Sequence, residues 1–160
     1  MIERRPRLSL TVQYATRGDD LPARALLRRW ARAALTRDAV VTLRFVDEAE
    51  GRALNQSYRR RRRPTNVLAF VYHDVHGAHG VDGDLVLCAP VMRREAAEQG
   101  KSLANHCAHL VIHGLLHLQG YDHEQATEAA RMEAREVAIL AGLGLPDPYR
   151  APGRSRRRPS

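Results

Sequence analysis

Residues 102–120 are the part of the chain that most constrains its fold. Ser102 is a favoured N-cap residue, and Gly120 can adopt the left-handed conformation that ends a helix. Between them, His113 and His117 are four residues apart, which places both imidazoles on one face of the helix, one turn from each other. The segment therefore predicts a long helix with two metal-ligating side chains near its C-terminal end.

A third ligand follows the helix. A turn at Gly120 would bring the chain back and move His123 toward the other two rings. Three neutral nitrogen donors suit zinc, and Cys107 is no fourth ligand because it lies about 120° around the helix from His113. Three protein ligands plus an open position are typical of catalytic zinc sites, whose bound water has a pKa of about 7. The alternative is a histidine-rich helix surface whose rings are only hydrogen-bonded.

Other polar residues are candidates for supporting the ligands or contacting a substrate. His106 and His109 continue the same helical face; the polar edge of a half-buried helix is the favoured interpretation for His106 and an equal alternative for His109. Asp122 has the position either to orient a ligand imidazole or to cap the last helix. Asp84 is expected to open a strand, where it either lines the cleft or only begins the strand.

The remaining sequence alternates between strand and helix patterns. Strands are expected at residues 8–14, 40–46, 67–72 and 84–88. Helices are expected at residues 22–36 after an Asp20 cap, at 48–58 after an Asp47 cap, and at 90–100 and 124–141, with residues 73–83 as a loop. This pattern predicts an α+β fold in which about five helices pack on a small mixed four-stranded sheet, with the zinc site at the end of the long helix. Residues 1–146 are expected to form one domain, and residues 147–160 a basic, disordered tail.

Positive charge is concentrated in two short runs. The formal net charge is +8, yet residues 59–63 and 150–160 each contribute five arginines, so the rest of the chain is slightly acidic. A local basic run is what binding to a phosphate backbone requires, which indicates a nucleic acid or another acidic partner. The residues expected to bind RNA are Arg60, Arg61, Arg62 and Arg63.

The composition also indicates the compartment. No apolar run approaches the roughly 20 residues of a membrane span, and charged residues follow Met1 where a signal peptide would need an apolar stretch. Cys88 and Cys107 fit reduced thiols better than a disulfide framework. A cytoplasmic protein with no membrane partner is expected.

Two classes of zinc hydrolase compete for the histidine pattern. The spacing of His113, His117 and His123 is similar to that of metzincin proteases, but those enzymes need a glutamate after the first histidine as general base, and this chain has Gly114 there. Their Met-turn is also missing, since Met132 lies in a helical pattern. Cleavage of a phosphodiester instead builds negative charge on phosphoryl oxygens, which a metal and an arginine can stabilise together.

Three stretches resemble one known family, the YbeY endoribonucleases or rRNA maturation factors. They are HGLLHLQGYDH at residues 113–123, LNQSYR at 54–59 leading to PTNVLAF at 64–70, and GDLVL at 83–87. Their order and spacing fit over about residues 8–145. The chain departs from the family where Asn66, Ala69 and Val71 stand in place of the frequent Asp, Ser and Pro.

The resemblance implies a zinc-dependent, single-strand-specific endoribonuclease that matures the 3′ end of 16S rRNA and serves ribosome quality control. It implies binding of one Zn²⁺ per chain by His113, His117 and His123, and a catalytic or phosphate-binding role for Arg59. The expected partners are single-stranded RNA, rRNA and the small ribosomal subunit. The alternatives are a zinc-dependent protease and a non-enzymatic ribosome-assembly factor with structural zinc.

Overall fold

One mixed four-stranded sheet organises the structure, a computed structural model that describes residues 5–59, 66–72, 80–121 and 125–150. The strands lie in the order β1-β2-β4-β3. Their bounds are β1 Leu8–Tyr14, β2 Asp38–Val46, β3 Val67–Val71 and β4 Gly80–Cys88. β1, β2 and β4 run parallel, whereas β3 is antiparallel to β4. The mixed α+β architecture predicted from the sequence is confirmed.

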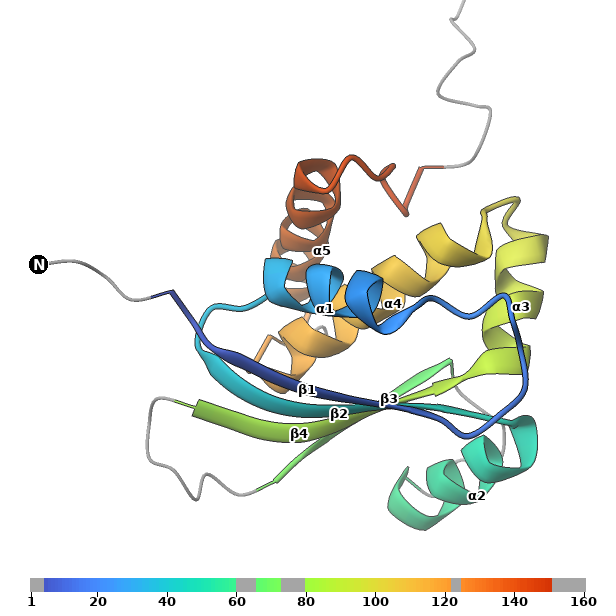
Figure 1. Cartoon of the computed structure of the whole chain (residues 1–160). Helices are drawn as coiled ribbons and strands as arrows, with labels where there is room; N and C mark the ends of the chain where they lie inside the picture. Colours follow the sequence, from blue (N-terminus) through green and yellow to red (C-terminus); the bar gives the residue numbers. More distant parts are fainter. Residues whose placement is uncertain (1–4, 60–65, 73–79, 122–124, 151–160) are drawn as a thin grey trace, which may run out of the picture.

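Five helices surround the sheet within the described residues. They are α1 Arg24–Ala33, α2 Glu48–Arg59, α3 Ala89–Glu98, α4 Leu103–Leu118 and α5 Ala126–Gly142. α1, α4 and α5 lie on one side of the sheet, and α2 lies on the other (Figure 1). Among the described helices, none is both long and apolar enough to cross a membrane.

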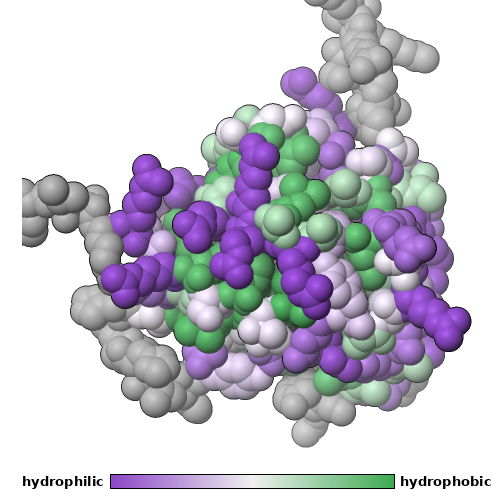
Figure 2. All heavy atoms as spheres, viewed as in Figure 1, coloured by the Kyte–Doolittle hydropathy of each residue, from purple (hydrophilic) through white to green (hydrophobic). Residues whose placement is uncertain are grey.

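The strand alternation divides the apolar side chains between two cores. Leu85 and Leu87 of β4 face the layer of α4 and belong to the larger core. Val86 and Cys88 face the other side and pack with Leu54 of α2. On the side of α1, hydrophilic side chains extend over an apolar surface (Figure 2), and α1 itself exposes Arg24, Arg28, Arg29 and Arg32.

α4 is the central helix of the larger core. It contacts α1, α3, α5 and two strands, and ten of its residues are buried. Cys107 is among them as a free thiol, and burial raises its pKa to about 12. The thiol points into the apolar core, which agrees with the prediction that Cys107 faces away from His113.

Several boundaries differ from the sequence-based expectation, and two of these differences have a clear physical cause. α1 begins at Arg24, and Asp20 does not cap it, because its carboxylate accepts two hydrogen bonds of 2.9 Å from the guanidinium of Arg93. β4 begins at Gly80 rather than Asp84, because the backbone of residues 80–83 pairs with β2. The predicted caps Asp47 and Ser102 are confirmed, with hydrogen bonds of 2.8 and 3.0 Å to backbone N–H groups.

Candidate metal centre

A stripe of histidines interrupts the otherwise apolar surface of α4. His106, His109, His113 and His117 follow one another at intervals of three or four residues, so they line one side of the helix. As predicted, the helix ends just before Gly120, whose φ is 103°. The N–H groups of Gly120 and Tyr121 each donate a hydrogen bond of 3.1 Å back to the last turn, which satisfies carbonyls there.

Gln119 fixes the end of α4 to the neighbouring layer. Its buried side-chain amide donates to the carbonyl of Ala34 at 2.8 Å and to that of Leu115 at 2.9 Å. Its Oε1 accepts from the N–H of Thr36 at 2.7 Å. These bonds fix the C-terminal end of α4 against the segment that follows α1.

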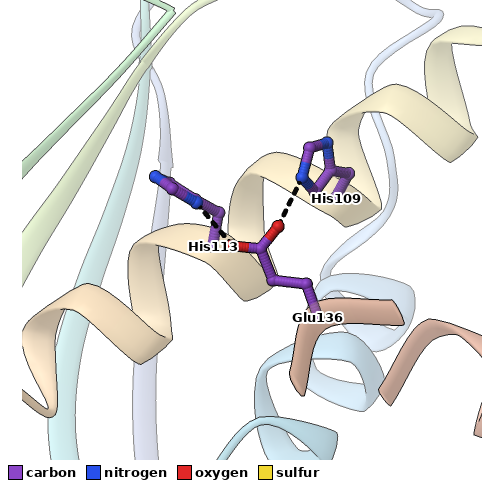
Figure 3. Close-up of side chains that lie close together, drawn as sticks. All are labelled: His109, His113 and Glu136. Atoms are coloured by element: carbon purple, nitrogen blue, oxygen red, sulfur yellow. Dashed lines mark hydrogen bonds and ion pairs between the residues drawn. The ribbon is translucent and has the colours of Figure 1, made fainter. Parts of the chain in front are cut away.

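Glu136 of α5 is the carboxylate that meets the histidine stripe (Figure 3). Its side chain is fully buried, and it lies 2.7 Å from Nε2 of His109 and 2.7 Å from Nδ1 of His113. The hydroxyl of Tyr149 also donates to it. Burial alone would raise the pKa of Glu136, but the bonds from His109, His113 and Tyr149 outweigh it and hold the pKa at about 2.

The charge of Glu136 determines the protonation of its partners. An ionised carboxylate only accepts hydrogen bonds, so Nδ1 of His113 and Nε2 of His109 must both carry protons. The lone pair of a neutral His113 ring is therefore on Nε2, at the end of the ring turned away from Glu136 (Figure 3).

His109, His113 and Glu136 form a group that could hold a metal ion. Their ligand atoms all lie within 4.8 Å of one another, and two imidazoles with a carboxylate are donors that zinc and related divalent ions accept. The sequence analysis missed Glu136. The signal that could have found it is its place at four-residue spacing between the buried Met132 and Leu140, where a charge is out of place.

The structure brings together only some of the predicted site residues. His113 and His117 lie on successive turns of α4, and Glu136 links His113 to His109. Asp84 lies apart from these histidines, because it shares the sheet face of Val86 and accepts a hydrogen bond from the hydroxyl of Tyr72. Asp122 and His123 lie outside the described residues, as do Arg60, Arg61, Arg62 and Arg63, and α2 ends at Arg59.

A second polar network lies next to the histidine stripe. His106 is buried, and its Nε2 lies 2.9 Å from Glu95 of α3. The amide of Asn66 donates to the same carboxylate at 3.0 and 3.2 Å. Burial on its own would raise the pKa of Glu95, but the bonds from His106 and Asn66 outweigh it and lower the pKa.

A pocket of about 600 Å³ opens over both networks. Its walls include His109, Lys101, Tyr149 and Arg150. The ammonium group of Lys101 donates to the carbonyl of Pro148 at 2.6 Å, so residues 147–150, which the sequence analysis assigned to the tail, lie against the domain. The pocket combines two cationic groups with a half-exposed aromatic ring beside the metal-capable group.

Comparison with known proteins adds the family. The family described as Endoribonuclease YbeY matches residues 16–144. The chain belongs to the YbeY endoribonuclease family. Proteins named Endoribonuclease YbeY from Herminiimonas arsenicoxydans and Thiobacillus denitrificans are similar to it: the first is 55% identical over 149 residues and covers 89% of this chain and 96% of its own length. The second is 54% identical over 144 residues, and the match covers 90% of this chain and 97% of the relative's own length.

A solved structure supports the fold of this YbeY family member. The solution structure of TM1509 from Thermotoga maritima matches with a TM-score of 0.52 and 24% identity, covering 92% of this chain and 100% of that one. At this identity the likeness concerns the arrangement of the chain alone. The sequence-based assignment to the family is confirmed.

Proposed function

We propose that this YbeY family member is a cytoplasmic, zinc-dependent and single-strand-specific endoribonuclease. Its proposed role is rRNA maturation, including the 3′ end of 16S rRNA, and ribosome quality control, with residues 1–146 as the catalytic domain. The observation that carries the proposal is the buried Glu136 paired at 2.7 Å with His113, in a chain whose relatives are named endoribonucleases. A charged carboxylate is costly to bury, so its use to hold an imidazole favours a functional centre.

His113, His117 and His123 are the proposed ligands of one Zn²⁺. A proton on Nδ1 of His113 makes Nε2 its ligand atom, which is the usual arrangement when a carboxylate stands behind a metal-binding imidazole. His117 is one turn further along α4, and His123 follows the turn at Gly120 by three residues in the sequence. Glu136 now accepts hydrogen bonds from the ring N–H groups of His109 and His113. If Glu136 bound the metal directly together with these rings, the metal would have to replace both protons.

Positive charge from the protein completes the proposed site. A divalent cation supplies Lewis-acid stabilisation of a phosphoryl oxygen. Arg59 provides a second positive charge for the same oxygens, and Arg60–Arg63 bind the RNA backbone. The attacking group is either water, which leaves a 5′-phosphate, or the RNA 2′-hydroxyl, which leaves a 2′,3′-cyclic phosphate.

Cleavage and metal content, measured together, test the proposal. The purified protein should contain about one zinc per chain and cut single-stranded RNA, and a chelator should abolish cleavage. His117→Ala should lose zinc and cleavage together. Arg59→Glu should keep zinc and lose cleavage, whereas Arg52→Glu, an exposed charge reversal on the same helix, should keep both.

The same measurements separate the competing functions. A zinc-loaded protein that binds RNA without cutting it would support a non-enzymatic ribosome-assembly factor and refute the nuclease. Full cleavage by Arg59→Glu would refute only the role assigned to Arg59 and would leave the nuclease proposal standing. Cleavage of casein, with no cleavage of RNA, would indicate a protease.

A further inference from the structure

Glu136 is a buried charge whose ion-pair partners, among the described residues, are both histidines. Its side chain is 0% exposed, and His109 and His113 each contact one of its oxygens at 2.7 Å. No described lysine or arginine forms an ion pair with it, so nearby imidazole N–H groups and a hydroxyl carry its stabilisation. Such a carboxylate is costly as a purely structural element, because an apolar side chain would fill the same space without desolvation.

The bond to His113 controls how that ring is presented. Because the carboxylate only accepts, it holds His113 with the proton on Nδ1 and holds the ring plane in one orientation. A ring released from this bond would exchange the proton between its two nitrogens and rotate about its side-chain bonds. Glu136 therefore selects the tautomer in which Nε2 can bind a metal ion.

Tyr149 extends the network into the C-terminal segment. Its hydroxyl donates to Glu136, and its ring meets the ring of His109 edge to face, with centroids 5.3 Å apart. Burial and the neighbouring Glu136 both raise the pKa of Tyr149, so its hydroxyl keeps the proton that it donates. The segment is itself held by Lys101, whose ammonium group donates to the carbonyl of Pro148 at 2.6 Å.

From this geometry we infer that Glu136 is a positioning residue of the metal centre, and that Tyr149 makes residues 147–150 part of the same centre. The inference rests on the proposed function, in which His113 is a ligand. Glu136 acts through His113, whereas Tyr149 acts through Glu136. Through Tyr149, residues 147–150 thereby pack against Glu136, which supports His113, and releasing them should weaken metal binding.

Three variants test the inference by measurements other than activity. Glu136→Gln keeps the size of the side chain but replaces one acceptor oxygen by a donor. Tyr149→Phe removes only the hydroxyl. Glu133→Gln is the matched control, an exposed glutamate on the same helix. Zinc affinity is measured by competition with a chromophoric chelator, and the His113 tautomer by ¹⁵N NMR of the metal-free proteins.

The expected results are graded. Glu136→Gln should weaken zinc binding by about 10–100-fold, which is typical for loss of a partner behind a metal ligand. In the same variant the metal-free His113 should change from the Nδ1–H form to a mixture of tautomers. Tyr149→Phe should weaken zinc binding less than Glu136→Gln does, and Glu133→Gln should match the wild type in both measurements.

Several results would overturn the inference. One is a Glu136→Gln protein with wild-type zinc affinity and an unchanged His113 tautomer. Another is a wild-type protein whose metal-free His113 carries its proton on Nε2, which remains measurable even if Glu136→Gln does not fold. X-ray absorption that shows one zinc ligand fewer in Glu136→Gln would make Glu136 a ligand instead. A wild-type protein that binds no zinc would refute the proposed function, while the tautomer would still report the bond to Glu136.

Discussion

Gly114 of α4 lies so close to Leu85 of β4 that a β-carbon on Gly114 would be 2.7 Å from Cδ2 of Leu85. Leu85 is fully buried, so its side chain has little room to move away. The position directly after His113 therefore faces the sheet rather than the metal centre. A glutamate, the general base that metzincin proteases carry there, would not fit, which gives a physical reason for the glycine in this sequence.

Gly114→Ala should consequently destabilise the protein despite the better helix propensity of alanine. Overpacking against Leu85 should lower the free energy of unfolding by about 1–3 kcal/mol. Gly142→Ala is the control, since nothing lies within 4 Å of the β-carbon it would add at the end of α5. Urea denaturation should show Gly142→Ala unchanged or up to about 1 kcal/mol more stable. Equal stabilities of the two variants would contradict the close packing.

Gln119→Ala should release the end of α4 from the neighbouring layer. The buried carbonyl of Ala34 would lose its partner, and a buried group left unsatisfied costs about 1–3 kcal/mol. We expect the free energy of unfolding to fall by about 1–3 kcal/mol in urea denaturation. Gln56→Ala, an exposed glutamine on α2, should change it by less than about 0.5 kcal/mol. A Gln119→Ala protein as stable as this control would refute the anchoring role.

Glu95 should make the free energy of unfolding depend on pH in the acid range. Its pKa in the folded protein lies below the ordinary value of 4.5, because the bonds from His106 and Asn66 outweigh burial and Arg94 adds to them. Its contribution is therefore present above pH 4.5 and is lost as the pH falls through the folded pKa. Urea denaturation should show Glu95→Gln clearly less stable than wild type near about pH 6, with a smaller difference near about pH 3.

The control for this pH dependence is Glu98→Gln, an exposed glutamate on the same helix. It should follow the wild-type curve at both pH values, since its side chain is exposed to solvent. A difference between Glu95→Gln and wild type that stays constant with pH would show that Glu95 contributes by packing rather than by charge.

Lys101 and Arg150 should contribute to RNA affinity, because both line the pocket beside His109. Lys101→Ala and Arg150→Ala should each weaken binding of a single-stranded oligoribonucleotide and lower its salt dependence by about 0.7 in log–log slope. Metal-free protein separates this binding from cleavage. Arg28→Ala, on α1 outside the pocket, should bind like wild type. If it weakens binding equally, overall charge rather than the pocket holds the RNA.

The sequence by itself determined the elements of this fold and one side of the metal centre. Period-two alternation marked β1, and the Ser102 cap and Gly120 marked the limits of α4. The four-residue interval between His113 and His117 placed both on one helix face, because the helical period is fixed by local backbone geometry. The motif around the histidines, with the stretches at residues 54–70 and 83–87, also identified the family without any contact being known.

Only the tertiary structure decided which residues form hydrogen bonds with those histidines. Glu136 follows His113 by 23 residues, and Tyr149 follows His109 by 40, separations for which no local spacing rule exists. The packing of α5 against α4 brings Glu136 to His113, and the segment that follows α5 brings Tyr149 to His109. In the same way, pairing with β2 extends β4 to Gly80, and Asp20 binds the guanidinium of Arg93 instead of capping α1. Local periodicity fixes which face a side chain occupies, but its partner depends on how separate elements pack.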